Sequence, residues 1–97
     1  MERGGCVYIM TNVSNTVLYI GVTSNLFSRV TEHKEKIYPT SFTAKYNCNK
    51  LVYYLFYPTI EEAIASEKSV KKWNRDWKIA LIIKDNPKWL DLYNDDL

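Results

Sequence analysis

The sequence predicts an α+β fold, in which helices flank a small three-stranded and mainly antiparallel sheet in the order ββαβαα. Two observations predict it. Three short segments, 6–12, 17–23 and 50–57, are rich in β-branched and aromatic residues and end at turn signals. Segments with apolar residues at helical spacing follow the second and third of them. The length of 97 residues, 46% of them hydrophobic, fits one globular domain, 1–97, with its core at about 6–93.

The first two segments are predicted to form a β-hairpin that turns at Ser14 and Asn15. With an even number of loop residues, Tyr8 pairs with Gly21, and Tyr8 and Tyr19 share one face of the sheet. An odd loop would place the two tyrosines on opposite faces. Gly21 carries no side chain, so a ligand or another backbone has room to approach the two hydroxyls. The alternative is that both tyrosines are ordinary strand residues.

A first helix is predicted from about Leu26 to Lys36, capped by Ser24 or Asn25 and ended by Pro39. Its apolar stripe consists of Leu26, Val30, His33 and Ile37. A polar stretch, 39–49, leads to the third strand, which Pro58 closes.

A second helix begins after Thr59, with Glu62 completing a capping box, and ends near Trp73 or Asn74. Its apolar stripe consists of Ile60, Ala63, Ile64 and Val70. A further helix is predicted from the cap Asp76 to about Lys84, where Asn86-Pro87 stops it. Its apolar face would contain Trp77, Ala80 and Leu81.

Two polar features interrupt the apolar stripes of these helices. Arg29 and His33 lie four residues apart, so they are neighbours on the first helix. They are either a solvated arginine beside a packed histidine or a pair of donors for a phosphate group. Glu67 lies inside the buried stripe of the second helix, where a lone carboxylate is costly and needs a partner. That partner is either Arg29, in a structural salt bridge, or a divalent metal ion.

A basic run follows Glu67 and comprises Lys68, Lys71, Lys72, Arg75 and Lys78, interleaved with Trp73 and Trp77. Such a run is either a solvated helix face or a surface for the backbone and bases of nucleic acid. The net charge of +2 does not by itself indicate a nucleic-acid partner.

Several protein classes are disfavoured by the sequence. No apolar secretion signal precedes the first strand, and the apolar run 51–57 is far shorter than the roughly 20 residues of a membrane helix. We therefore expect a cytoplasmic protein without a membrane partner. Cys6 and Cys48 are isolated, which predicts two packing residues instead of a disulfide or a zinc site.

The tripeptides Cys6-Val7-Tyr8 and Tyr19-Ile20-Gly21 resemble the two signature tripeptides of the GIY-YIG endonuclease family, with cysteine and valine replacing the first glycine and isoleucine. Arg29, His33 and Glu67 match the arginine, histidine and glutamate of that family. The stretches 19–26, 42–46 and 67–73 are similar to its single-domain bacterial branch, which is related to the nuclease module of the bacterial excision-repair machinery.

The resemblance implies a divalent-metal-dependent endonuclease that hydrolyses phosphodiester bonds in DNA. Glu67 would hold one Mg²⁺ or Mn²⁺, Arg29 would clamp the phosphate, His33 would orient water or phosphate, and Tyr8 or Tyr19 would be the general base. Arg29 would lower the pKa of that tyrosine. Contacts to DNA would come from Lys45, Lys68, Lys71, Lys72 and Arg75, and a partner protein would select the target.

Two departures from the family favour an alternative, a catalytically inactive nucleic-acid-binding or protein-interaction module of the same fold. The asparagine that follows the glutamate in several members has no match, because this chain has Trp77-Lys78-Ile79 there. Val22 replaces the lysine that some members carry after the second tripeptide.

Overall fold

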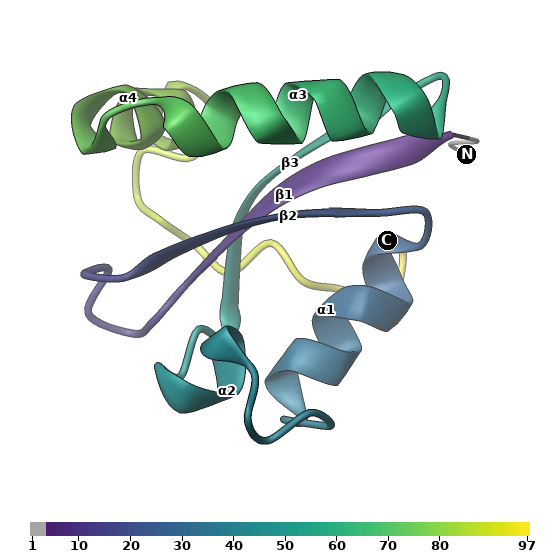
Figure 1. Ribbon diagram of the computed structural model, residues 1–97. Helices are drawn as coiled ribbons and strands as arrows, with labels where there is room; N and C mark the ends of the chain where they lie inside the picture. Colours follow the sequence, from purple (N-terminus) through teal and green to yellow (C-terminus); the bar gives the residue numbers. More distant parts are fainter. Residues whose placement is uncertain (1–3) are drawn as a thin grey trace.

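A computed structural model describes residues 4–97 and confirms the α+β class (Figure 1). Three strands form one antiparallel sheet in the spatial order β2-β1-β3, so β2 is an edge strand. The elements are β1 (Gly5–Thr11), β2 (Leu18–Thr23), α1 (Leu26–Lys34), α2 (Phe42–Lys45), β3 (Lys50–Tyr57), α3 (Ile60–Lys72) and α4 (Arg75–Asp85).

The predicted hairpin register is confirmed. Tyr8 pairs with Gly21 and Met10 pairs with Tyr19 across β1 and β2. Asn15 has a φ of 59°, in the left-handed region that asparagine tolerates better than most residues, and its amide closes the turn on the Asn12 carbonyl at 3.0 Å. This turn determines which residues of the two strands face each other.

Helices cover both faces of the sheet (Figure 1). One face packs against α3 and α4 through a core that includes Val7, Ile9, Ile20, Val52, Ala63, Val70 and Ile82. The opposite face packs against α1 and the segment around α2 through a core that includes Cys6, Tyr8, Met10, Leu26, Val30, Cys48 and Leu51. Because neighbouring residues of a strand point to opposite faces, β1 supplies both cores and is buried along its whole length.

The helix boundaries differ from prediction in three places. The first helix ends at Lys34 instead of Lys36, because Lys36 adopts a φ of 54° and Ile37 is 52% exposed, outside the buried stripe. The predicted polar stretch contains the one-turn helix α2, which Ser41 caps by accepting a hydrogen bond from the Ala44 amide. The last helix begins at Arg75, because Asn74 is its cap and not Asp76.

The predicted apolar face of the last helix is only partly right, because Leu81 alone of its residues packs against the core. Ile82 is the buried residue of α4, whereas Trp77 is 59% exposed and Ala80 is exposed. In α3, Ala63, Glu67 and Val70 are buried as predicted, although Ile64 is exposed. Trp73, which lies between the two helices, ends α3 with an extended conformation that turns the chain into α4.

Asn86 anchors the C-terminal segment to β3. Its side-chain amide donates to the carbonyls of Val52 and Leu90, at 3.1 and 2.9 Å, and its oxygen accepts from the Leu90 amide. Val52 lies where the β1–β3 register shifts, so Asn86 satisfies a carbonyl at an irregularity of the ladder.

Both cysteines are buried, as predicted for packing residues. Within residues 4–97, no helix is long and apolar enough to cross a membrane.

Candidate active site

Tyr8 lies at the centre of the site and is only 1% exposed. Its ring lies across its hairpin partner Gly21, where an added Cβ would be 2.5 Å from the Tyr8 hydroxyl and 2.8 Å from Cε1. The space above Gly21 therefore holds the Tyr8 ring itself instead of a ligand. A glycine is required at this position because any side chain would displace the phenol.

A buried chain of hydrogen bonds joins Tyr8 to α1 and α2. The Tyr8 hydroxyl lies 2.8 Å from His33 Nε2, and His33 Nδ1 lies 2.8 Å from Thr43 Oγ1. His33 occupies the buried face of α1 and is 7% exposed, while the short helix α2 carries Thr43. Both ring nitrogens of His33 are thus engaged within the protein, which leaves neither free to hold water or phosphate.

Burial controls the protonation of this chain. It lowers the pKa of His33 to about 4, helped by the positive charge of Arg29 and opposed by Glu32. The imidazole is therefore neutral at neutral pH, with one ring nitrogen donating and the other accepting. Burial also raises the pKa of Tyr8, as does Tyr19, and the opposing effect of Arg29 is smaller. Arg29 does act to lower the pKa of Tyr8, as expected, but burial and Tyr19 outweigh it, so the pKa of Tyr8 is raised and not depressed.

Arg29 extends from α1 beside this chain. Its guanidinium pairs with Glu32 at 2.9 Å and lies 5.9 Å from the centre of the Tyr38 ring. The side chains of Arg29 and Glu32 are 37% and 36% exposed, so the pair is open to solvent and to an incoming anion. Arg29 does not form the salt bridge with Glu67 that the sequence allowed, since Glu67 pairs with Lys71.

A pocket of about 200 Å³ opens where these residues meet. Its lining comes from β2, α1 and the segment that includes α2: Tyr19, Arg29, Glu32, His33, Tyr38, Ser41, Phe42 and Thr43. Tyr19 is partly buried, and its ring centre lies 6.2 Å from that of Tyr8 and 5.5 Å from that of His33. Four of the five predicted catalytic residues, Tyr8, Tyr19, Arg29 and His33, are therefore together.

Glu67 approaches the site from the other layer of the fold. It lies on α3, which covers the opposite face of the sheet, and is 8% exposed. Its Oε2 accepts from the Lys71 ammonium at 2.6 Å, and this hydrogen bond raises the pKa of Lys71. Lys71 also interacts electrostatically with Tyr19, which lies on the edge strand β2 and lines the pocket.

The donor set fits a hard divalent cation better than zinc. Within residues 4–97, no three His, Cys, Asp or Glu side chains gather into a group that could hold a metal ion by itself, as a zinc site would need, so waters and substrate would have to complete any site at Glu67. The ion pair with Lys71 engages Glu67 through Oε2. One carboxylate, completed by waters and substrate phosphate, is the arrangement in which Mg²⁺ is usually bound.

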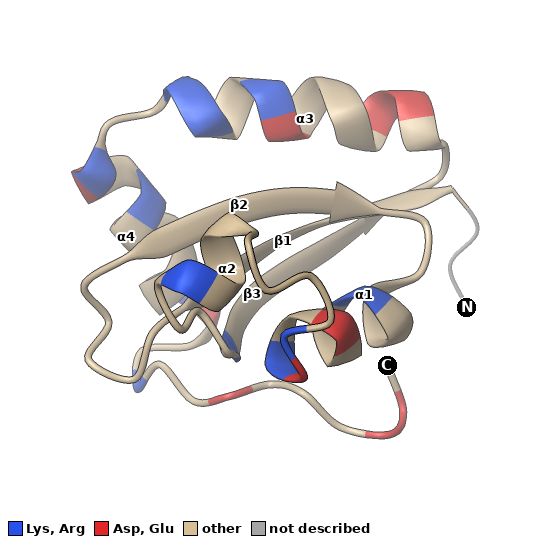
Figure 2. Ribbon diagram, turned by 60° about the horizontal axis from the view of Figure 1, so that its bottom comes forward, with Lys and Arg blue, Asp and Glu red and all other residues tan. Residues whose placement is uncertain are grey.

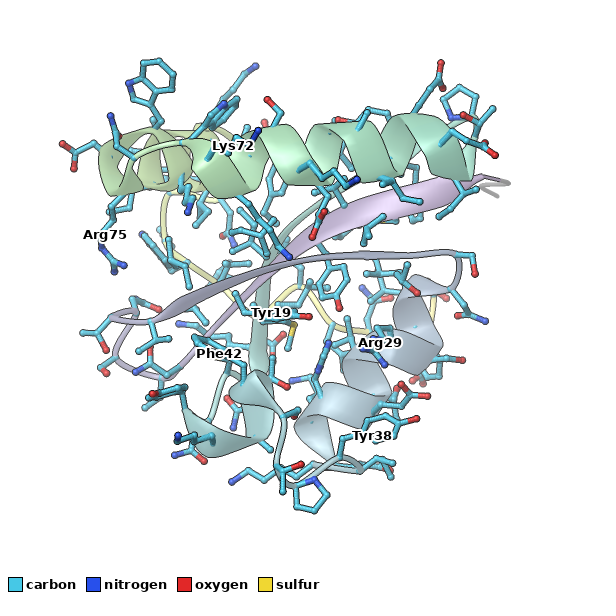
Figure 3. The ribbon with its side chains drawn as sticks, viewed as in Figure 1. Tyr19, Arg29, Tyr38, Phe42, Lys72 and Arg75 are labelled. Atoms are coloured by element: carbon cyan, nitrogen blue, oxygen red, sulfur yellow. The ribbon has the colours of Figure 1, made fainter. Side chains whose placement is uncertain are left out.

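The predicted DNA-contacting residues fall into two groups. Lys45 lies on α2, whereas Lys68, Lys71 and Lys72 lie on α3 and Arg75 begins α4, so positive charge follows the C-terminal half of α3 (Figure 2). Figure 3 shows Lys72 and Arg75 on the α3–α4 side of the sheet, with Tyr19, Arg29 and Phe42 on the other side. Arg75 donates to the Asn15 carbonyl at 3.3 Å, which ties α4 to the hairpin turn.

Several site residues were not singled out from the sequence, namely Glu32, Tyr38, Phe42 and Thr43. Phe42 and Thr43 belong to the stretch 42–46 that resembles the single-domain bacterial branch. That similarity is the feature of the sequence that could have identified these two residues as part of the site. Glu32 lies three residues after Arg29, a helical spacing that predicts a pair.

A family model described as the GIY-YIG catalytic domain matches residues 4–80. The chain belongs to the GIY-YIG family. The match includes both tripeptides and all five predicted catalytic residues, and it stops within α4.

Two other proteins are similar to this GIY-YIG domain. A UPF0213 protein from Syntrophus aciditrophicus (strain SB) is 33% identical over 82 residues, which is 84% of this chain and 92% of the relative. The solution NMR structure of a UPF0213 protein from Bacillus halodurans matches with a TM-score of 0.56 and 24% identity, covering 90% of each chain. The second likeness supports the fold alone.

Proposed function

We propose that this GIY-YIG domain is a divalent-metal-dependent endonuclease that hydrolyses phosphodiester bonds in DNA. The observation that carries the proposal is the common pocket of Tyr19, Arg29 and His33, supported from behind by Tyr8. A cation, a phenol and a buried neutral imidazole around one small opening suit a reaction at a phosphate group.

Arg29 would bind a non-bridging oxygen of the scissile phosphate. One guanidinium nitrogen, NH1, pairs with Glu32, and the planar fork of arginine has further donors. A phosphate, which accepts two parallel hydrogen bonds from such a fork, would compete effectively for this exposed guanidinium. Glu32 would then hold the side chain in position from the opposite side.

Tyr19 is the better candidate for the general base. It lines the pocket, whereas Tyr8 is 1% exposed and burial raises its pKa, which keeps its proton in place. Lys71 interacts electrostatically with Tyr19, so a positive charge would lie near Tyr19 when it acts as a phenolate. That phenolate would take a proton from water as the water oxygen bonds to phosphorus and the bond to the 3′-oxygen breaks.

Tyr8 and His33 would act as positioning residues. The Tyr8–His33–Thr43 chain forms an uncharged wall behind Tyr19 and Arg29, since its groups are buried and hydrogen-bonded to one another. This wall would keep the reacting phosphate at the open end of the pocket, next to Arg29. The role expected of His33 from the family, orienting water or phosphate, would then pass to Arg29.

Glu67 would hold the metal ion. The ion would either displace the Lys71 ammonium from the carboxylate or share the carboxylate with it. A bound Mg²⁺ or Mn²⁺ would supply neutralisation of charge on the phosphate and on the leaving oxygen. Metal binding would move Lys71 first, because its ammonium lies 2.6 Å from Glu67 Oε2.

The proposal is tested by nicking of supercoiled plasmid and cleavage of labelled single-stranded, flapped and duplex DNA with Mg²⁺ or Mn²⁺. We expect cleavage by the wild type, and loss of roughly a hundredfold or more in Glu67→Gln, Arg29→Ala and Tyr19→Phe. Tyr8→Phe should retain more activity than Tyr19→Phe. Glu61→Gln, which neutralises an exposed carboxylate on the same helix, is the matched control and should cleave like the wild type.

A binding module without cleavage is the second candidate, and one observation favours it. Both chemically important charges already have partners within the chain, Arg29 with Glu32 and Glu67 with Lys71. Metal-independent DNA binding with no cleavage of any substrate would overturn the nuclease proposal and support this module. Wild-type cleavage by Glu67→Gln would instead overturn the role of Glu67.

A further inference from the structure

Three aromatic side chains are exposed at the rim of the pocket. Tyr38 is 53% exposed, Phe42 45% and Tyr46 43%, and all three come from the segment 38–46. Tyr38 and Phe42 also line the pocket. Large apolar rings gathered at one opening usually mark a binding surface, because exposing them to water is unfavourable.

Two of these rings continue a row that begins inside the pocket. The Tyr46 ring centre lies 4.7 Å from that of Phe42, and the Phe42 ring centre lies 5.9 Å from that of Tyr19. Figure 3 shows Phe42 beside Tyr19, on the side of the sheet that α2 covers. The row therefore leads from the proposed general base outward to solvent.

Cations accompany the aromatic rings. The Arg29 guanidinium lies 5.9 Å from the centre of the Tyr38 ring, and the Lys45 ammonium lies 5.7 Å from the centre of the Tyr46 ring. A positive groove lined with aromatic rings is the combination by which proteins bind single-stranded nucleic acid, since cations follow the phosphates and rings stack on the bases.

The segment that carries the rings is held in place by buried side chains and by hydrogen bonds to the rest of the protein. Thr43 and Ala44 are buried, and Thr43 bonds to His33. The Ser41 hydroxyl caps α2, and the Cys48 amide donates to the Thr43 carbonyl at 2.9 Å. Phe42 and Tyr46 are thus carried, partly exposed, on an ordered turn, which lowers the entropy cost of stacking against a ligand.

The pocket is too small to admit a whole nucleotide strand. Its volume of about 200 Å³ lies below the roughly 300–1,000 Å³ of sites for drug-sized ligands. A phosphate group can enter beside Arg29, but the base attached to the same sugar must stay at the rim. Phe42 and Tyr46, which are 45% and 43% exposed, lie at this rim.

We propose that Phe42 and Tyr46 form a stacking subsite for an unpaired nucleobase next to the phosphate held by Arg29. The inference rests on the proposed nuclease function and specifies its substrate class: DNA that is single-stranded where it enters the site. In a continuous duplex both faces of each base are covered by neighbouring bases, so a duplex cannot offer a face to these rings without unstacking.

The test is binding of fluorescein-labelled oligothymidylate, followed by anisotropy in EDTA so that cleavage does not interfere. Phe42→Leu keeps an apolar side chain and removes the flat ring, and it should weaken binding roughly tenfold, the order expected for one stacked base. Phe42→Trp should bind as tightly as the wild type or more tightly. Tyr46→Leu should give a smaller loss.

Two comparisons make the result specific. Phe56→Leu changes a phenylalanine of similar exposure, 39%, on β3 outside the pocket and should leave binding unchanged. Binding of a blunt duplex should be equal in the wild type and in Phe42→Leu. Equal oligothymidylate binding by the wild type and Phe42→Leu, or equal weakening on duplex and single strand, would overturn the stacking subsite.

The two proposals fail separately. If no DNA is cleaved under any condition, the nuclease proposal fails, while the binding comparison still decides whether a base stacks on Phe42. If Glu67-dependent cleavage is observed but Phe42→Leu binds and cuts single-stranded DNA like the wild type, the nuclease proposal stands and the subsite is wrong. If Phe42→Leu does not fold, the binding of oligothymidylate by Tyr46→Leu and Phe42→Trp decides the question. Stacking would be refuted if Tyr46→Leu bound like the wild type and Phe42→Trp bound more weakly.

Discussion

The stability of the protein should depend on pH through His33, which is the only histidine in the chain. Burial, with Arg29, lowers its pKa to about 4 in the folded state, whereas the unfolded chain has the ordinary value of about 6.5. As the pH falls below about 6.5, the unfolded state binds a proton that the folded state does not. The free energy of unfolding should therefore fall with pH until about pH 4, where the folded imidazole is also protonated.

A lowering of the His33 pKa by this amount corresponds to a loss of about 3 kcal/mol in the free energy of unfolding between those two pH values. Domains of this kind are typically stable by only about 5–15 kcal/mol, so the loss is a large fraction of the total. The proton on His33 would also make both ring nitrogens donors. One of the two hydroxyls, from Tyr8 or Thr43, would then have to accept where it previously donated.

Two measurements check this prediction. The ring-proton resonances of a single histidine can be followed by NMR against pH, and their midpoint in the folded protein should lie near 4. Urea unfolding of the wild type and of His33→Gln, compared from about pH 7 to about pH 4.5, should show a shallower pH dependence in the variant, by about one proton. A midpoint near the ordinary value, or equal slopes for the two proteins, would refute the reasoning.

Two further predictions concern stability. Gly21→Ala would place a Cβ 2.5 Å from the Tyr8 hydroxyl and should lower the free energy of unfolding by about 1–3 kcal/mol in urea, a cost that Tyr8→Leu should largely remove when the two changes are combined. Additive effects in that double variant would contradict the close approach. Asn86→Ala should cost about 1–3 kcal/mol because the Val52 carbonyl and the Leu90 amide lose their partner, and an unchanged thermal midpoint would argue against this anchor.

Much of the local structure was predictable because it depends on neighbouring residues. The caps Asn25 and Thr59 accept hydrogen bonds from the amides of Ser28 and Glu62, as their side-chain chemistry requires. The third strand matches its predicted bounds of 50–57, since Pro58 closes it. The errors occurred where two capping residues compete, as with Asn74 and Asp76, or where one turn of helix is too short for a periodic signal.

The candidate site was predictable in composition but not in its internal contacts. Glu67 was identified because a carboxylate inside an apolar stripe needs a partner, and its burial is confirmed. Its partner is Lys71, four residues on, a pair that helical spacing favours over one with the distant Arg29. The dual engagement of His33 could not be predicted, because Tyr8 and Thr43 lie 25 and 10 residues away in the chain.

The sequence by itself determined the family, the hairpin register that pairs Tyr8 with Gly21, and the identity of the charged groups. These follow from residue types and short spacings, which need no knowledge of how layers pack. Only the tertiary structure decided that α3 covers one face of the sheet while the pocket opens on the other, with β2 between them. Packing also decided which tyrosine is buried, because burial depends on every element that closes over a side chain and not on that residue alone.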